Sequence, residues 1–445
     1  DMDMVSCGFL NTLEESLKEG KVTEEQINAA CRRVLEAKYK LGLFSDPYKY
    51  CDTLRVEKEL YTTAHRAVAR EIAAETFVLL KNEDHLLPLE RKGKIALIGP
   101  MADARNNMCG MWSMTCTPSC HGTLLEGIRS AAGDKAEILY ARGSNIYHDA
   151  ELEKGGAGIR PLERGNELQL LDEALHTAAR ADVIVAALGE CAEMSGESAS
   201  RTELGIPDAQ QDLLKALVKT GKPVVLLLFT GRPLVLNWED ANVHSILNVW
   251  FGGSETGDAI ADVLFGKVTP GGKLTTTFPR SVGQLPLYYN HLNTGRPDPD
   301  SHSFNRYSSN YLDMSNEPLY PFGYGLSYTN FSYGNLQLSS DVLSRNGELT
   351  VSVTVTNDGD FDGYEIVQMY LHDIYAEISR PVKELKGFER IFLKKGESRE
   401  VKFVITEDDL RFYNSGLQYV YEPGEFDVMV GANSRDVQTE RFRAE

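Results

Sequence analysis

Ala181-Asp-Val-Ile-Val-Ala-Ala-Leu-Gly-Glu-Cys-Ala-Glu-Met-Ser-Gly-Glu-Ser-Ala-Ser-Arg201 is the stretch that decides the fold. Residues 183–188 within it form an unbroken apolar run, which is typical of a parallel strand buried on both faces. Gly189 ends the run, and a polar loop follows it. Pro207 then begins a predicted helix, which Gly221 caps. The loop therefore leaves the carboxyl end of a central strand, where open α/β sheets place their ligands.

The polar loop carries side chains suited to acid/base catalysis or to binding hydroxyl groups. Glu190, Glu193 and Glu197 supply three carboxylates, and two serines and Arg201 accompany them. From the residues alone all three glutamates are candidates. For any single one of them, a solvated loop carboxylate is the alternative.

Apolar runs and helical patterns alternate on both sides of this stretch. Strands are predicted at residues 95–99, 137–141, 183–188, 224–229 and 246–251, and helices at about 123–132, 167–180, 207–220 and 255–265. This alternation implies right-handed crossovers and a mostly parallel sheet. A dinucleotide-binding fold is the alternative, but no G-x-G-x-x-G motif follows any of the strands.

The segment before the sheet is predicted to be helical. Residues 5–18 form one helix, and Thr23-Glu-Glu-Gln26 is a capping-box pattern that begins a second helix, closed by Gly42. After a polar connection, residues 60–81 are predicted as one long, Ala-rich helix. Two helices without an intervening strand resemble the end of a larger unit.

The composition changes after the sheet. Residues 280–334 are rich in Tyr, Asn, Pro and Gly and are predicted to be a long connector. Alternation with a period of two follows at residues 349–356, 367–371, 401–405 and 426–430. This alternation, with turns between the segments, is typical of an antiparallel β-sandwich, which is more often structural than catalytic.

The overall composition limits the function. The 445 residues are enough for about three domains of roughly 150 residues each. The net charge of −19 argues against nucleic acid and against an anionic membrane surface, while a neutral ligand such as a sugar remains compatible. The longest apolar runs fall far short of the ~20 residues that span a bilayer.

The seven cysteines form no obvious disulfide framework. Cys109, Cys116 and Cys120 lie close together and His121 follows them, so a zinc site is one hypothesis. The spacing is irregular, however, and no Cys-x-x-Cys pair is present. Ordinary loop thiols without a metal are therefore the preferred interpretation.

Motifs along the whole chain resemble those of β-glucosidases of glycoside hydrolase family 3, in their C-terminal portion. They are Asp1-Met-Asp-Met4, Arg32-Arg-Val-Leu-Glu-Ala-Lys38, Leu41-Gly-Leu-Phe44, Leu79-Leu-Lys-Asn82, Leu87-Pro-Leu89, Asp262-Val-Leu-Phe-Gly266, Pro270-Gly-Gly-Lys-Leu274, Leu285-Pro-Leu-Tyr-Tyr-Asn290, Pro321-Phe-Gly-Tyr-Gly-Leu-Ser327 and Arg380-Pro-Val-Lys-Glu-Leu-Lys-Gly-Phe388. They match from end to end and in order.

The resemblance implies a domain plan. It consists of the last helices of a (β/α)₈ barrel, an α/β sandwich domain and a fibronectin type III-like domain. The expected limits are residues 1–45 for the barrel remnant, 46–300 for the α/β domain with its linker, 301–334 for a connector and 335–445 for the last domain.

The resemblance also implies roles for residues. Glu197 is selected as the catalytic acid/base of a retaining glycosidase, and Glu190 is expected to support the loop. Trp112 matches a tryptophan that lines the sugar site, with a buried core position as the alternative, and Asp1 and Asp3 lie near the expected sugar subsite. His121 and Arg201 are weaker candidates for the border of the pocket.

The partners and surroundings are expectations of the same kind. The substrates are β-glucoside oligosaccharides or aryl glucosides, no cofactor is needed, and an upstream barrel carries the nucleophile, an aspartate. A homodimer and a periplasmic or secreted location are further expectations. A β-xylosidase, or a non-catalytic carbohydrate-binding or assembly module without a barrel, are the alternatives.

Overall fold

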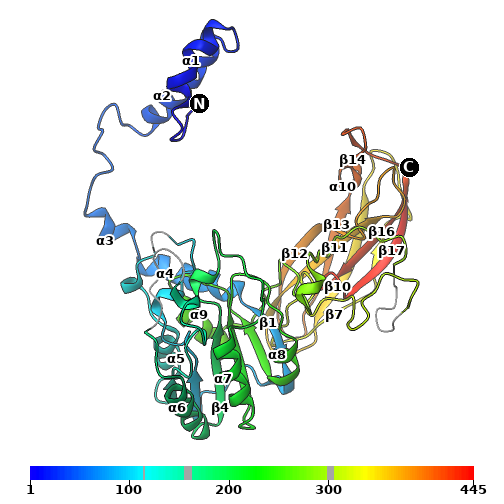
Figure 1. The fold of residues 1–445 in the computed structure, drawn as a ribbon. Helices are drawn as coiled ribbons and strands as arrows, with labels where there is room; N and C mark the ends of the chain where they lie inside the picture. Colours follow the sequence, from blue (N-terminus) through cyan, green and yellow to red (C-terminus); the bar gives the residue numbers. More distant parts are fainter. Residues whose placement is uncertain (114–115, 155–162, 298–304) are drawn as a thin grey trace. The chain divides into compact units, whose positions relative to one another are not determined.

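The computed structural model describes residues 1–113, 116–154, 163–297 and 305–445. It divides into two compact units, Asp1–His65 and Arg66–Glu445 (Figure 1). The sheet and the sandwich described below both belong to the second unit. The domain limits at residues 45, 300 and 334 remain predictions.

Short helices make up the first unit. They are α1 (Gly8–Lys18), α2 (Glu24–Lys40) and α3 (Arg55–Glu59). The predicted capping box begins α2, because the Thr23 hydroxyl accepts a hydrogen bond from the Gln26 N–H while the Gln26 side chain accepts one from Thr23 N–H. These bonds satisfy amide groups that the start of a helix leaves without partners.

A six-stranded sheet organises the first part of the second unit. Its strands are β1 (Val78–Asn82), β2 (Lys94–Ile98), β3 (Glu137–Ala141), β4 (Val183–Gly189), β5 (Val224–Phe229) and β6 (Ser245–Asn248). Their order is β1-β6-β5-β4-β2-β3, and only β1 and β6 pair in antiparallel fashion. The predicted mostly parallel sheet is therefore confirmed, with β4 in its interior.

Helices cover both faces of this sheet (Figure 1). One core contains residues of α4 (Thr63–Thr76), α5 (Leu124–Ala132) and α9 (Thr256–Leu264). The other contains residues of α6 (Glu167–Ala179) and α7 (Asp208–Val218), and Trp238 of the short helix α8 (Asn237–Asn242) packs against it. Because every strand of the sheet's interior lies between two apolar layers, β4 and β5 need to be apolar on both sides.

The predicted helix over residues 60–81 is wrong at its C-terminal end, after Thr76. The helix α4 ends at Thr76, and Val78–Asn82 forms the edge strand β1. Phe77, Leu79 and Leu80 are almost completely buried, and β1 pairs with β6. The Ala-rich pattern favours a helix locally, but pairing with the sheet and burial of three large apolar side chains override that preference.

The last part of the chain is a β-sandwich (Figure 1). One sheet contains β7 (Phe331–Tyr333), β8 (Gln337–Leu338), β10 (Leu349–Asn357) and β13 (Ser398–Ile405). The second contains β9 (Val342–Leu343), β11 (Gly363–Asp373), β12 (Glu384–Leu393), β16 (Gly424–Gly431) and β17 (Val437–Ala444). A small pair, β14 (Phe412–Tyr413) and β15 (Tyr419–Val420), and the short helix α10 (Glu407–Leu410) complete it. Its pairings are antiparallel apart from that of β9 with β17, so the predicted sandwich is confirmed.

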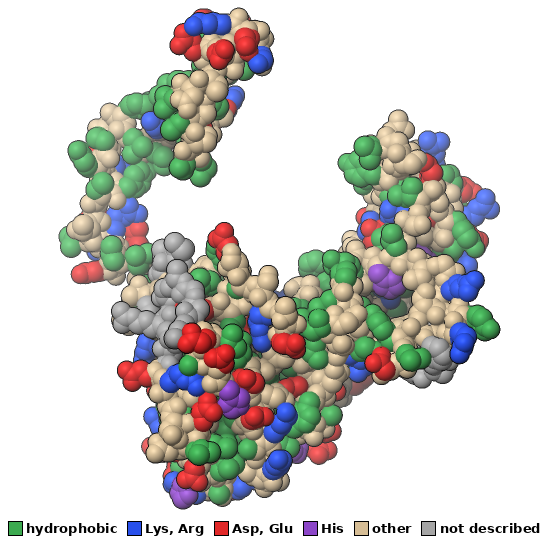
Figure 2. Space-filling view, viewed as in Figure 1, with side chains coloured by type: hydrophobic (Ala, Val, Ile, Leu, Met, Phe, Trp, Pro, Cys, Tyr) green, Lys and Arg blue, Asp and Glu red, His purple; other side chains and the backbone are tan. Residues whose placement is uncertain are grey.

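The surface of the second unit carries charges of both signs. Figure 2 shows Asp and Glu side chains interspersed with Lys and Arg side chains over the face that it presents. Over the whole sequence, 65 acidic residues outnumber 46 basic ones. Among the described residues, none of the helices combines the length and the apolar character needed to span a bilayer.

Candidate active site

The candidate site is the loop between β4 and α7, at the carboxyl end of an interior strand. Gly189, at the end of β4, has a φ of 129°. A Cβ atom at this position would lie 2.0 Å from the carbonyl oxygen of Phe229 in β5. Only glycine allows the two strand ends to approach this closely. The loop therefore begins in tight contact with the end of the neighbouring strand.

Glu190 is the anchor of this loop, because its side chain is completely buried. Its Oε1 lies 2.8 Å from Arg201 Nη1 and 3.0 Å from Arg232 Nε. Its Oε2 accepts hydrogen bonds from the Thr230 hydroxyl and from Gly231 N–H, both at 3.0 Å. A buried carboxylate is costly unless it is paired and hydrogen-bonded, and Glu190 meets both conditions. Its position agrees with the supporting role expected from the sequence.

The two arginines that pair with Glu190 also bind backbone carbonyl oxygens elsewhere in the loop. Arg232 donates to the carbonyl oxygens of Met194 and Ala199, the latter at 2.8 Å. Arg201 donates to the carbonyl oxygen of Gly205 at 3.0 Å. Backbone groups on both sides of residues 195–198 are thus tied to one buried carboxylate. The loop is held by charge-assisted hydrogen bonds rather than by regular secondary structure.

Glu197 occupies the exposed part of this loop. Gly196 before it has a φ of 106°, and Ser198 after it has a φ of 59°. Ser198 is not a glycine, so its left-handed backbone indicates a conformation that the surrounding contacts impose. An exposed carboxylate on an anchored loop can contact a ligand without movement of the sheet. Glu193, the third candidate, lies half-buried in the single 3₁₀ turn Ala192–Met194.

Trp112 lies beside this loop and is not a core residue. Its exposed fraction is 74%, so the alternative of a buried tryptophan is wrong. A Cβ atom on Gly196 would lie 2.8 Å from Met111 Cγ and 3.4 Å from Trp112 Nε1. The residue next to Glu197 is therefore in contact with the segment that carries Trp112. An exposed indole ring next to a carboxylate offers a flat surface on which a sugar ring can stack.

A disulfide closes the segment around Trp112. Cys109 and Cys116 are bonded, which corrects the interpretation of these two cysteines as ordinary thiols. The donor atoms of Cys109, Cys116 and His121 lie within 4.8 Å of one another, which is the grouping that the zinc hypothesis required. Two of the three are consumed by the disulfide, so the set does not fit a metal in this oxidised form. The Cys spacing alone gave no signal for this pairing.

His121 and Arg201 have structural partners. His121 is buried, and its Nε2 lies 2.9 Å from the carbonyl oxygen of Arg105. Because a carbonyl only accepts, Nε2 carries the proton. Arg201 is paired with Glu190, as described above.

Asp1 and Asp3 belong to the first compact unit. Asp1 forms an ion pair with Arg33. Asp3 accepts a hydrogen bond from Ser6 and another from the Phe9 N–H at 3.2 Å, at the start of α1. The hydrogen bond from Ser6 lowers the pKa of the Asp3 carboxyl most, and the backbone bonds lower it further. Asp3 therefore acts at least as a helix-capping group, and a subsite role for either residue remains a prediction.

Thr230, Gly231 and Arg232 also belong to this site, although no motif in the sequence predicted them. They follow β5 directly, so they lie at the same sheet edge as the loop that follows β4. The rule that the carboxyl ends of neighbouring parallel strands meet at one edge could have found them.

Comparisons with known proteins agree with this architecture. Residues 77–328 match the model of the glycosyl hydrolase family 3 C-terminal domain, and residues 365–434 match that of a fibronectin type III-like domain. The chain is 46% identical over 452 residues to a periplasmic beta-glucosidase of Salmonella typhimurium, covering 99% of this chain and 58% of that protein. It is 39% identical to a beta-xylosidase of Formosa agariphila, covering 98% of this chain and 58% of that protein.

A solved structure gives the same result. The beta-glucosidase of Listeria innocua in complex with isofagomine superposes with a TM-score of 0.87 at 37% identity, over 100% of this chain and 59% of that one. The same enzyme has been solved with glucose and, as a mutant, with laminaribiose. This chain thus spans somewhat more than half the length of the relatives that it matches.

Proposed function

Because the chain belongs to glycoside hydrolase family 3, we propose that it supplies the acid/base catalyst of a retaining β-glucosidase. The observation that carries the proposal is the exposed Glu197 on a loop held by the buried Glu190 and its two arginines. The partner is a (β/α)₈ barrel that carries the nucleophile. The substrates are β-glucosides with a terminal, non-reducing glucosyl residue.

The reaction divides the work between two carboxylates. In the first step the barrel carboxylate attacks the anomeric carbon, while Glu197 protonates the departing glycosidic oxygen. In the second step Glu197 removes a proton from the water that attacks the glycosyl-enzyme. Retention of configuration requires the two carboxyl groups to lie roughly 5–5.5 Å apart. A general acid must hold its proton before reaction, which exclusion of water and a nearby negative charge both favour.

Trp112 and the loop give the substrate its position. The exposed indole ring stacks on the sugar next to the carboxylate, so the glycosidic oxygen comes within reach of Glu197. Asp1 and Asp3 are proposed to lie at the sugar subsite, with Asp3 in a supporting position because it already caps α1.

The test uses a protein that contains the barrel. Glu197→Gln should slow cellobiose hydrolysis by about 10²–10⁴-fold, because protonation of a poor leaving group is lost. Glu203→Gln is the matched control, since Glu203 is an exposed carboxylate on the same loop. Equal losses for the two variants would contradict the assignment.

A β-xylosidase is the second candidate, because the similar protein of Formosa agariphila carries that name. The ratio of kcat/KM for 4-nitrophenyl β-glucoside and β-xyloside decides between the two activities. A ratio above one supports the glucosidase, and a ratio well below one supports the xylosidase.

The periplasm is the proposed location, since the similar Salmonella typhimurium protein is named periplasmic. The Cys109–Cys116 disulfide is consistent with an oxidising compartment. Activity that stays with the cytoplasmic marker after osmotic shock would contradict this location. A homodimer remains a prediction that light scattering can test.

A further inference from the structure

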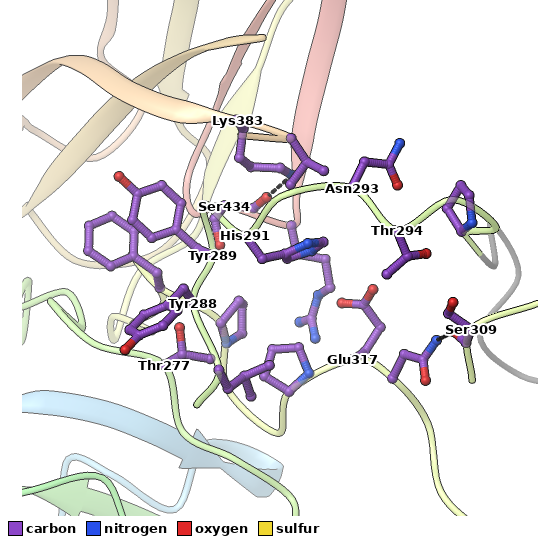
Figure 3. Close-up of a pocket in the computed structure, with 18 of the residues that line it drawn as sticks. Thr277, Tyr288, Tyr289, His291, Asn293, Thr294, Ser309, Glu317, Lys383 and Ser434 are labelled. Atoms are coloured by element: carbon purple, nitrogen blue, oxygen red, sulfur yellow. Dashed lines mark hydrogen bonds between the residues drawn. The ribbon is translucent and has the colours of Figure 1, made fainter. Parts of the chain in front are cut away.

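A cavity of about 830 Å³ lies where the connector, here residues 280–334, meets the sandwich. It shares no lining residue with the Glu197 loop, and the proposed reaction does not use it. Small-molecule sites commonly have volumes of ~300–1,000 Å³, so the cavity is large enough for a ligand. Figure 3 shows side chains that line it; they come from the connector, from two loops of the sandwich and from Thr277, just before the connector.

Hydrogen bonds between connector and sandwich fix the walls of this cavity. Val382 N–H donates to the carbonyl oxygen of His291, and Ser434 N–H donates to that of Phe322, both at 2.9 Å. Tyr289 stacks on Phe322 with their ring centroids 4.2 Å apart. Two parts of the connector, at His291 and at Phe322, are thus each bonded to a different loop of the sandwich. A site with fixed walls loses less conformational entropy when a ligand binds.

Three charged side chains of both signs line the cavity: Lys383, Arg435 and Glu317, of which Arg435 is paired with Asp436 at 3.4 Å. Lys383 and Glu317 both line it, and in Figure 3 they lie on opposite sides with His291 between them. Burial lowers the pKa of the Lys383 ammonium, while the nearby Glu317 carboxylate raises it in part. Lys383 Nζ donates to the carbonyl oxygen of Ser434 at 2.6 Å. An ammonium has three donors, so it can bind a further acceptor.

Neutral polar groups and an aromatic ring complete the lining. His291 Nδ1 lies 2.9 Å from the carbonyl oxygen of Leu292, which only accepts, so Nε2 of the neutral ring is an acceptor. Asn293 and Thr294 add an amide and a hydroxyl group. Tyr288, whose exposed fraction is 62%, adds an aromatic ring.

This combination fits one chemical class of ligand. A sugar has a flat face of C–H groups and a rim of hydroxyl groups, each of which donates and accepts. It needs an aromatic surface together with both donors and acceptors. An anion would be attracted by Lys383 but repelled by Glu317, and Arg435, the second cation of the lining, already has Asp436 as its partner. An apolar ligand would leave the charged groups unsatisfied.

We propose that the connector and the sandwich form a second saccharide-binding site, which binds a neutral β-linked oligosaccharide outside the reacting centre. Tyr288 stacks on one sugar ring, and Lys383, Glu317 and His291 bind its hydroxyl groups. Its role rests on the proposed glycosidase function: the site retains a β-glucan chain on the protein between cleavage events. It gives the sandwich a binding role in addition to its structural one.

Isothermal titration calorimetry of the 445-residue chain with cellotetraose tests the site without any turnover. We expect binding at millimolar concentrations that Tyr288→Ala weakens by at least about fivefold, because the stacking surface is lost. Lys383→Met should weaken it about tenfold through loss of a charged donor. Tyr288 is largely exposed, so its variant tests the site even if Lys383→Met does not fold.

Three controls make the outcome decisive. Tyr413→Ala removes a tyrosine of similar exposure, 64%, that does not line the cavity, and it should leave binding unchanged. Glu197→Gln should also leave it unchanged, which separates this site from the proposed catalytic one. Inorganic phosphate should not compete with cellotetraose. The proposal is overturned if cellotetraose does not bind, if Tyr288→Ala has no effect, if Glu197→Gln abolishes binding, or if phosphate displaces the sugar. None of these results would bear on whether Glu197 is the acid/base.

Discussion

At the scale of single residues, burial separates two glutamates that look alike in the sequence. Glu190 is completely buried and paired with Arg201 and Arg232, so its carboxylate serves to hold the loop in place. Glu197 is exposed on the loop that Glu190 holds. A catalytic acid must exchange protons with its substrate, which requires access that Glu190 lacks. The catalytic assignment therefore rests on exposure as well as on resemblance.

Glu190→Gln should destabilise the second unit by about 3–5 kcal/mol, because it leaves two arginines without their buried partner. Hydrolysis by the barrel-containing protein should fall as well, since the loop carrying Glu197 loses its anchor. Azide should not restore the activity of this variant, because Glu197 is still present. Thermal unfolding and rescue assays check both statements. An unchanged melting temperature together with azide rescue would instead identify Glu190 as the acid/base.

Trp112→Ala should raise KM about tenfold and leave stability almost unchanged. Its indole is 74% exposed, and exposed substitutions usually change the free energy of unfolding by no more than ~0.5 kcal/mol. Loss of a stacking surface, by contrast, weakens binding of the sugar. Steady-state kinetics and a melting curve separate the two effects. A large fall in melting temperature with normal kinetics would show that Trp112 is a packing residue.

At the scale of elements, the sequence predicted best where one pattern dominates. The apolar runs of β4 and β5 are long enough to identify interior strands, and the Thr23 capping box fixed the start of α2. The edge strand β1 was missed because an Ala-rich helical pattern runs into Val78-Leu-Leu, and only pairing with β6 distinguishes the two. Local patterns do not report on long-range pairing.

In the candidate site, too, the residues marked by a local pattern were predicted and those brought together by long-range contacts were not. Glu190, Glu193 and Glu197 were found because they follow a strand directly. Three partners of Glu190, namely Thr230, Gly231 and Arg232, were missed because they lie 40 to 42 residues further along, at the end of β5. The Cys109–Cys116 bond was missed for a related reason, since cysteine spacing does not encode connectivity.

The disulfide leads to a prediction for the segment that carries Trp112. Thiol titration of the unfolded, unreduced protein should detect the five cysteines Cys7, Cys31, Cys51, Cys120 and Cys191, and reduction should reveal two more. Cys109→Ser with Cys116→Ser should destabilise the protein by about 2–4 kcal/mol, because a closed loop restricts the unfolded chain. KM should rise because Trp112 is held less firmly beside Gly196. Seven reactive thiols together with stoichiometric zinc would favour the metal hypothesis instead.

At the scale of the whole molecule, the proposed catalysis is divided between this chain and a barrel. The 445-residue chain alone should not hydrolyse aryl β-glucosides, because acid/base catalysis without a nucleophile does not form the glycosyl-enzyme. The barrel-containing protein should hydrolyse them. Both are measured with 4-nitrophenyl β-glucoside at equal molar concentration. Turnover by the chain alone would refute the division of catalytic residues.

The most direct test of the central claim is the product that Glu197→Ala forms from 2,4-dinitrophenyl β-glucoside in the presence of azide. This leaving group needs little protonation, so the glycosyl-enzyme should form and then accumulate in the barrel-containing variant. Azide needs no general base, so it should restore turnover and yield β-glucosyl azide. If azide neither restores turnover nor yields β-glucosyl azide while cellobiose hydrolysis remains intact, Glu197 is not the acid/base.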